Sequence, residues 1–306
     1  MTRPLRIGII GCGRVVELGY IPALKKVRGA QLVAVADPVL ERCNRVAPGI
    51  RAYRSARELI EAGDVDAIVI ATPAAAHLHD ARLAGAAGLP TLVEKPPAAN
   101  VAEAIALAQV SPLPWIGFNR RFDSRVETIR AKIASDSVVE VSLDRFHPGA
   151  WTPYVVRDDL LDSHGPHNFD LIRWLTRSEI TRVRTLELTS QSVSLEVELE
   201  RGRAFARFGH ATSFRDSIEV RNAAGTLIGG HDTPGLFLRA ARRIVGGVNS
   251  LAQLLVGELE DLIEAANGRP VRSLATAHDG VPVMAAIEAA RVSAASGEWA
   301  PVPRYN

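Results

Sequence analysis

The stretch Leu5–Arg14, which reads LRIGIIGCGR, decides the fold of the first half of the chain. Its apolar beginning is rich in β-branched residues and too short for a stable helix, so it predicts a buried strand. The strand runs directly into Gly11, Cys12 and Gly13, and a helix-compatible segment follows from Val15. A strand, a glycine turn and a helix present a helix N-terminus to an anion, and a glycine without a Cβ lets a pyrophosphate approach the backbone.

Two further positions bear on a dinucleotide site. The third glycine of the complete fingerprint would stand at position 16, where the chain has Val16, so the glycine pattern is incomplete. Asp37 ends a second predicted strand, Gln31–Ala36, about 20 residues after the turn, where an acid binds the 2′-hydroxyl of an adenosine ribose. The acid favours NAD as the cofactor, while Arg42 nearby leaves NADP open.

Composition limits the class of protein. A length of 306 residues suggests about two domains, and 47% hydrophobic with 23% charged residues is typical of a globular protein. The net charge of +2 gives no electrostatic case for nucleic-acid binding. The two cysteines, Cys12 and Cys43, lack metal-ligand spacing and favour a reducing compartment. Without a signal-like or membrane-spanning apolar run, we expect a soluble cytoplasmic protein with neither a membrane nor a nucleic acid as partner.

The order of predicted elements indicates two domains. In the first 120 residues, strands alternate with helices, which predicts an α/β fold with a doubly wound parallel sheet. After the boundary, strands follow one another and predict a mostly antiparallel sheet at 138–146, 180–188, 192–200, 203–210 and 218–223. Helices are expected there at 160–176, 236–244, 251–267 and 281–296. We therefore predict a dinucleotide-binding domain at residues 1–120 and a substrate and oligomerisation domain at 121–306, whose last helix is a candidate to pack on the first domain.

Ligands of doubly wound sheets bind beyond the carboxyl ends of the strands. The turns after the predicted strands hold the candidate cofactor-binding residues, namely Gly11, Cys12, Gly13, Arg14, Val15, Asp37, Thr72, Pro73, His77, Glu94 and Lys95. Lys95 is one of four lysines, and the prolines that follow it stiffen its turn. A partly desolvated lysine beside a nicotinamide has a lowered pKa and can exchange a proton with a substrate hydroxyl. The alternative is an exposed lysine in a proline-rich turn.

A second candidate stretch is Leu161–Trp174. Pro166 suits the first position of a helix, so His167 lies in the first turn, where the helix dipole disfavours the imidazolium. Asp170, one turn further, orients His167 or caps the turn. A metal site built from His164, His167 and Asp170 is the weaker interpretation, because no further ligand is apparent.

With these residues the chain resembles the Gfo/Idh/MocA oxidoreductase family. The matching motifs run nearly end to end and comprise Ile7–Arg14, Ala71-Thr72-Pro73 with His77, Glu94-Lys95-Pro96, Gly117–Phe122, Gly165 with His167 and Asp170, and Asp279-Gly280 followed by Ala289, Ala290 and Ser293. The resemblance implies a Rossmann domain, a second α/β domain with a large open sheet, and a homodimer or homotetramer. It also implies NAD(P)-dependent hydride transfer at a hydroxyl or carbonyl carbon of a sugar, cyclitol or related polyol.

By motif position, Lys95 corresponds to the catalytic lysine and His167 to the general acid/base of the family. The family usually has an acid four residues before this histidine, where this chain has Ser163. A one-residue insertion would leave Asp162 in the catalytic role; otherwise Ser163 relays a proton or binds substrate. The candidate substrate-binding residues are Lys95, Arg121, Ser163, His167 and Asn168.

Two other functions stay in view. Val16 and Ser163 favour a non-catalytic dinucleotide-binding sensor or partner protein. A methyltransferase would also use a glycine turn and an acid, but it gives no role to Lys95 or His167. The sequence does not name the substrate; an anionic group on it would find candidate partners in Arg120, Arg121, Arg145 and Arg157.

Overall fold

The computed structural model describes residues 3–134, 137, 139–148, 159–232 and 250–305. The chain forms two compact units, one of residues 1–122 with 248–281 and the other of residues 123–247 with 282–306. The first crossing between them lies close to the predicted boundary at residue 120. Residues 248–281 belong to the first unit, whereas the sequence-based division placed them in the second domain. The helix predicted at 236–244 lies outside the described residues.

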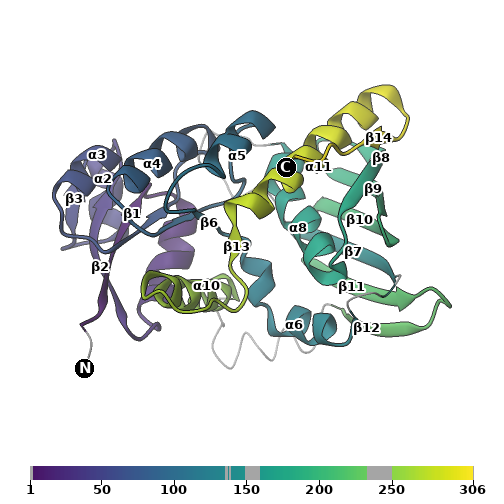
Figure 1. The fold of residues 1–306 in the computed structure, drawn as a ribbon, viewed down its shortest axis with the longest axis horizontal. Coiled ribbons are helices and arrows are strands. Elements are labelled where there is room, and N and C mark those ends of the chain that lie inside the picture. Colours follow the sequence, from purple (N-terminus) through teal and green to yellow (C-terminus); the bar gives the residue numbers. More distant parts are fainter. Residues whose placement is uncertain (1–2, 135–136, 138, 149–158, 233–249, 306) are drawn as a thin grey trace. The chain divides into compact units, whose positions relative to one another are not determined.

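The first unit contains a sheet with the strand order β13-β6-β5-β4-β1-β2-β3 (Figure 1). Its strands are β1 (Leu5–Ile10), β2 (Ala30–Ala36), β3 (Arg51–Tyr53), β4 (Ala67–Ile70), β5 (Thr91–Val93), β6 (Trp115–Ile116) and β13 (Ala275–Thr276). Neighbouring strands are parallel, except that β13 runs antiparallel to β6. From β3 to β6, this is the strand order of doubly wound dinucleotide-binding sheets, so the predicted parallel sheet is confirmed.

The helical segments of the first unit are η1 (Val16–Tyr20), α1 (Ile21–Leu24), α2 (Leu40–Val46), α3 (Ala56–Glu61), α4 (Ala74–Ala86), α5 (Val101–Leu107), η2 (Asn119–Phe122) and α10 (Ser250–Ala266). The side-chain oxygens of Ser55 and Asn100 cap α3 and α5 by accepting the N–H of Glu58 and Glu103. The chain after the glycine turn winds as a π-helix through η1 before continuing as α1.

Helix α10 packs its apolar stripe into the core of the first unit. Leu255, Leu259 and Leu262 are fully buried, and they share a cluster with Val16 and Tyr20 of η1. Their spacing of three and four residues puts them on one face of the helix. The apolar face of α10 is thus covered by residues of the first unit that come more than a hundred residues earlier in the sequence.

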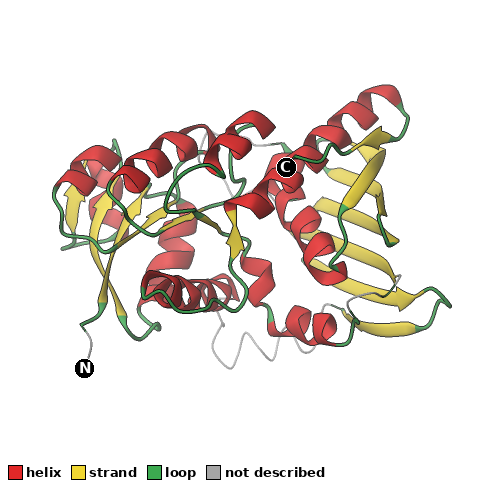
Figure 2. Ribbon diagram, viewed as in Figure 1, coloured by secondary structure: helices red, strands yellow, loops and turns green. Residues whose placement is uncertain are grey.

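The second unit is built on a sheet with the order β12-β11-β7-β10-β9-β8-β14 (Figure 2). Its strands are β7 (Val139–Pro148), β8 (Ile180–Leu188), β9 (Ser192–Leu199), β10 (Gly202–Ala211), β11 (Arg215–Asn222), β12 (Leu227–His231) and β14 (Ala300–Pro301). The pairs are antiparallel apart from β7 with β10, which agrees with the mostly antiparallel sheet predicted. Every second residue of β9 is buried, so one face of the sheet forms a core.

The helices of the second unit are α6 (Ser124–Ala131), α7 (Leu160–Ser163), α8 (Gly165–Thr176) and the larger part of α11 (Ala277–Ser296), in which the boundary between the units falls after Val281. The helix predicted over 160–176 is interrupted at His164, because Pro166 begins a new helix and has no N–H to continue the old one. Among the described residues, no helix combines the length and the apolarity needed to cross a membrane.

The end of α11 is joined to β8 by two hydroxyl groups. The backbone N–H of Thr185 donates to Ser293 Oγ at 2.8 Å, and Thr185 Oγ1 donates to the carbonyl of Ala290 at 2.7 Å. Ser293 Oγ in turn donates to the carbonyl of Glu298 at 2.6 Å. Ser293 therefore satisfies a buried strand N–H and holds the turn that follows the helix.

We expect Ser293→Ala to lower the free energy of unfolding by about 1–3 kcal/mol, because it leaves the buried Thr185 N–H without an acceptor. Urea denaturation followed by circular dichroism measures the change. Val292→Ala, at a neighbouring position of α11 that is 54% exposed, is the control and should cost less than about 0.5 kcal/mol. Equal effects of the two substitutions would contradict the role of Ser293.

Candidate active site

The glycine turn after β1 is set by crowding at one position and by open space at another. Gly11 has φ +94°, and a Cβ on it would stand 2.5 Å from the carbonyl oxygen of Ala71, so only glycine fits. Among the described residues, no heavy atom lies within 4 Å of the point where a Cβ of Gly13 would stand. The structure thus leaves space beside the backbone of Gly13, as a pyrophosphate requires.

Asp37 lies directly against this turn. Its Oδ2 accepts the N–H of Cys12 at 3.0 Å, and its Oδ1 accepts the N–H of Val39 at 2.9 Å. The Arg42 guanidinium is 3.8 Å from Oδ1. Because a carboxylate oxygen has more than one lone-pair direction, each oxygen keeps capacity for a ribose hydroxyl. The open space at Gly13 and this acid fit the adenosine and pyrophosphate parts of a dinucleotide.

The position of the missing third glycine is filled by core. Val16 is fully buried in the apolar cluster of the first unit. The close approach occurs instead at Gly19, where a Cβ would stand 2.6 Å from Leu255 Cδ1 of α10. A fingerprint read at its usual spacing misses this glycine, because here the first helical segment packs closely on another helix.

His77 connects two of the predicted cofactor-binding turns. Its fully buried ring places Nε2 2.8 Å from the carbonyl oxygen of Thr72 and Nδ1 3.4 Å from that of Pro97. Burial lowers the pKa of His77, so the ring is neutral with a single N–H, which the shorter distance assigns to Nε2. Thr72 Oγ1 also donates to Asp80 at 3.0 Å. His77 therefore positions the turns after β4 and β5.

The turn after β5 presents Lys95. Its side chain is half-buried, and its backbone N–H donates to Glu94 Oε2 at 3.0 Å. Burial lowers the pKa of His77, and the positive charge of Lys95 acts in the same direction. In the same unit, the buried Arg121 lies 3.5 Å from Asp279 Oδ1 and 5.8 Å from the centre of the Phe118 ring.

In the second unit, α8 begins at Gly165 and places the half-buried His167 in its first turn, as predicted. Asn168 is buried, and its Nδ2 donates to the carbonyl of His164 at 3.0 Å. Within the described residues, Asn168 Oδ1 has no hydrogen-bond partner. Asp170 is buried on the same helix.

Both candidates for the family acid have partners of their own. Asp162 Oδ2 lies 2.7 Å from the Arg291 guanidinium. Ser163 Oγ donates to the carbonyl of Asp159 at 2.8 Å and lies 2.8 Å from Nδ1 of His164. Asp162 is thus directed toward α11, and Ser163 lies beside the imidazole of His164.

His164 is part of an aromatic cluster, with ring centres 5.4 Å from His147, 5.8 Å from His210 and 6.3 Å from Phe208. Even so, the described part of the chain contains no group of three or more His, Cys, Asp or Glu side chains arranged to hold a metal ion. The structure therefore gives no support to the weaker metal interpretation.

Arg145 donates to His147 at 3.1 Å, and Arg157 lies outside the described residues.

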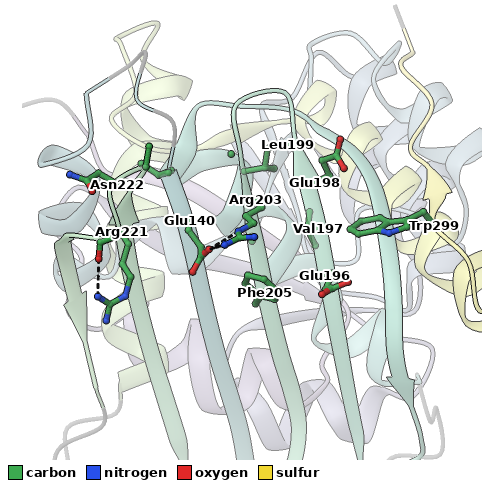
Figure 3. Close-up of a pocket in the computed structure, with 15 residues that line it drawn as sticks. Glu140, Glu196, Val197, Glu198, Leu199, Arg203, Phe205, Arg221, Asn222 and Trp299 are labelled. Carbon is green, nitrogen blue, oxygen red and sulfur yellow. Dashed lines mark hydrogen bonds and ion pairs between the residues drawn. The ribbon is translucent and has the colours of Figure 1, made fainter.

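A hollow on the sheet of the second unit contains none of the predicted site residues (Figure 3). Its charged side chains pair across neighbouring strands, as Arg203 does with Glu140 and Arg182 with Glu198. Trp299 lies beside this surface, and the Arg182 guanidinium stands 4.9 Å from the centre of its ring. These charged side chains are thus engaged with one another across the sheet.

Comparison with known proteins identifies the family. A protein-family model described as "Oxidoreductase family, NAD-binding Rossmann fold" matches residues 5–111 of the chain. The rhizopine catabolism protein MocA of Rhizobium meliloti is 30% identical over 311 aligned residues, which cover 95% of each chain. The chain belongs to the Gfo/Idh/MocA oxidoreductase family.

Further similarities agree with this assignment to the Gfo/Idh/MocA family. An inositol 2-dehydrogenase of Arthrobacter sp. (strain FB24) is 29% identical over 333 aligned residues, covering 97% of this chain and 96% of the relative. The structure of scyllo-inositol dehydrogenase from Lactobacillus casei with bound cofactor NAD(H) and scyllo-inositol has a TM-score of 0.82 at 19% identity, covering 98% and 99% of the two chains. The latter similarity shows the fold. The resemblance inferred from the sequence and the NAD-binding Rossmann fold are confirmed.

Several residues of this family member escaped the sequence analysis. Tyr20 of η1 and Glu258 of α10 are fully buried, and the Tyr20 hydroxyl contacts both the Glu258 carboxyl group and that of Glu94. Asp261 accepts three backbone N–H groups, and Arg291 binds Asp159 and Asp162. The available signal was an acid inside an apolar helical stripe, since Glu258 follows Leu255 by three residues and precedes Leu262 by four.

We expect Gly11→Ala and Gly13→Ala to separate folding from cofactor binding. Gly11→Ala should lower the free energy of unfolding by about 1–3 kcal/mol, because it strains a positive φ and crowds Ala71. Gly13→Ala should change stability by less than about 0.5 kcal/mol and still weaken NAD binding about tenfold or more, because its methyl group occupies the space beside the backbone. Urea denaturation and fluorescence titration with NAD measure the two effects. Unchanged NAD affinity in Gly13→Ala would refute this placement of the pyrophosphate.

Proposed function

We propose that the protein is an NAD-dependent dehydrogenase that oxidises a CH–OH group of a cyclitol, such as an inositol, to a ketone. The observation that carries the proposal is the position of Lys95 after β5, at the same strand ends as the glycine turn and Asp37. The cyclitol class is supported by the similarity to inositol 2-dehydrogenases over almost the whole chain.

When bound, NAD⁺ supplies the hydride acceptor. For this chain we propose that Gly11, Cys12, Gly13, Arg14 and Val15 surround the pyrophosphate, that Thr72, Pro73, His77 and Glu94 shape the same edge, and that Asp37 accepts hydrogen bonds from the adenosine ribose. The negative charge of Asp37 disfavours the additional phosphate of NADP, so NAD is the proposed cofactor.

We assign the proton of the substrate hydroxyl to Lys95 Nζ and to the imidazole of His167. General acid–base catalysis needs groups that gain and lose a proton near neutral pH, which an imidazole does and a partly desolvated amine can do. Ser163, four residues before His167, and Asn168, directly after it, are proposed to bind substrate. The partners of Asp162 and Arg121 favour a structural contribution from both, through Arg291 and Asp279 respectively.

We also propose that the enzyme is a cytoplasmic homodimer or homotetramer whose first unit binds NAD and whose second unit contributes to substrate binding and assembly. The support for the oligomer is the resemblance to a family that uses its open sheet in this way. Multi-angle light scattering of the purified protein should give the mass of two or four chains. The mass of one chain would contradict this part of the proposal.

Spectrophotometry of NADH formation with myo-inositol, scyllo-inositol and related polyols tests the function. We expect Lys95→Ala and His167→Ala each to lower kcat/KM by about 10²–10⁴-fold, with NAD affinity retained, because they remove a proton-transfer group. Lys132→Ala, at an exposed lysine of the second unit, is the matched control and should retain the rate. Asp162→Asn should lower the rate by less than about tenfold.

Three outcomes would count against the proposal. NAD binding without turnover of any polyol would favour a non-catalytic sensor. A Lys95→Ala variant with an unchanged rate would refute the assignment of the lysine. Faster turnover with NADP than with NAD would refute the role given to Asp37.

A further inference from the structure

Beneath Lys95, the first unit buries a phenol between two carboxyl groups. The Tyr20 hydroxyl oxygen lies 2.9 Å from Glu94 Oε1 and 3.1 Å from Glu258 Oε2. The exposed fractions are 0% for Tyr20, 4% for Glu94 and 0% for Glu258. Gly117 packs against both acids, so that a Cβ on it would stand 3.4 Å from Glu94 Cδ and 3.5 Å from Glu258 Oε1. Three ionisable groups from η1, the β5 turn and α10 therefore share one closed site.

Counting protons shows that both acids cannot be ionised there. A phenol has one proton, so Tyr20 can donate fully to only one carboxylate. The second short contact is satisfied when the other carboxyl group carries a proton and donates it to the phenol oxygen. Two carboxylates around one phenol would repel each other at low dielectric and leave one contact without a hydrogen.

The surroundings decide which acid is charged. Burial raises the pKa of Glu94 above its ordinary value, while the charge of Lys95 and the Tyr20 hydroxyl act in the opposite direction. Glu94 Oε2 also accepts the backbone N–H of Lys95 at 3.0 Å, which favours the carboxylate. In Glu258, Oε1 has no hydrogen-bond partner within the described residues. Burial, together with the charges of Glu94 and Asp261, raises the pKa of Glu258 well above its ordinary value. The charge therefore rests on Glu94 and the proton on Glu258.

Other charged groups near the network have their own partners. Asp261, one turn from Glu258 on α10, accepts the backbone N–H groups of residues 272–274. On η1, Glu17 pairs with Arg14. Further titratable side chains on the packed elements include the neutral His77, the cations Arg120, Arg121 and Arg272, and the acids Glu260, Glu264 and Asp279. Among these, Arg121 pairs with Asp279, and Glu264 pairs with Arg269.

We propose that Tyr20, Glu94 and Glu258 form a buried shared-proton network that holds its single negative charge on Glu94 and thereby sets the acidity and position of Lys95. Tyr20 and Glu258 are positioning residues that act through Glu94. Because the Lys95 charge favours ionised Glu94, ionised Glu94 equally favours protonated Lys95. The catalytic consequence rests on the proposed function, while the charge distribution can be measured without turnover.

The four lysines of the chain make a direct measurement feasible. Protein labelled with ¹³C at lysine Cε should give four lysine signals, and Lys95→Arg assigns the one of interest. We expect Glu94→Gln to lower the pKa of the Lys95 amine by about one unit, because it removes the neighbouring negative charge. Tyr20→Phe should also lower the pKa of the Lys95 amine, because Glu94 loses the hydrogen-bond donor that stabilises its carboxylate and becomes protonated.

Glu258→Gln keeps the shape and neutrality of the protonated acid, so it should leave the Lys95 pKa within about 0.3 units. Glu258→Met is a second neutral replacement if the amide disturbs folding. Glu260→Gln, an exposed acid on the same helix, is the matched control. The infrared C=O stretch of a protonated carboxyl group at neutral pH should disappear in Glu258→Gln and persist in the control.

Any of three results overturns the network. An equal fall of the Lys95 pKa in Glu258→Gln and Glu94→Gln would place charge on both acids, and no change in Glu94→Gln or Tyr20→Phe would remove the link to Lys95. The infrared band persisting in Glu258→Gln would also refute a protonated Glu258. If these measurements hold while no polyol is oxidised, the proposed function fails and the network stands.

Discussion

The close approach of the backbone after β1 to the backbone after β4 is the constraint on which the rest of the first unit depends. An added Cβ at Gly11 would meet the carbonyl oxygen of Ala71 at 2.5 Å, so the chain must turn there with a positive φ. That turn directs the N–H of Cys12 to the carboxylate of Asp37 at the end of β2. The carboxyl ends of β1, β2 and β4 thereby lie at one edge of the sheet. The residues that we propose to bind NAD follow these strand ends.

Buried acids and hydroxyl groups hold the remaining loops by accepting backbone N–H groups. Asp37 does this for the glycine turn, Asp261 for the segment before β13, and Ser293 for β8. A buried N–H costs free energy unless it has an acceptor, so each of these side chains selects one loop conformation. The Tyr20 site differs, because its two acids face a phenol with one proton, and the second contact needs a proton on one of the acids.

Much of the first unit could be predicted because its strands are short apolar runs bounded by glycine, proline or polar turns. Ser55 and Asn100 cap their helices through local hydrogen bonds that need no tertiary partner, so these helix starts depend only on residues close together in the sequence. Strand β12 was not predicted, because Gly229 and Gly230 weaken its propensity, and pairing with β11 supplies the stability instead. Pro166 predicted the start of α8, whereas the ion pair of Asp162 could not be predicted, because Arg291 comes from a distant segment.

The sequence by itself determined the parallel sheet, the glycine turn with its acid, the lysine turn and the start of α8, because these depend on residues close together along the chain. Only the tertiary structure decided that α10 belongs to the first unit and that the Tyr20 hydroxyl contacts both Glu94 and Glu258 there. The physical reason is that an amphipathic helix specifies an apolar face but not the surface that will cover it. A buried acid likewise takes its charge state from groups that folding brings to it from distant parts of the chain.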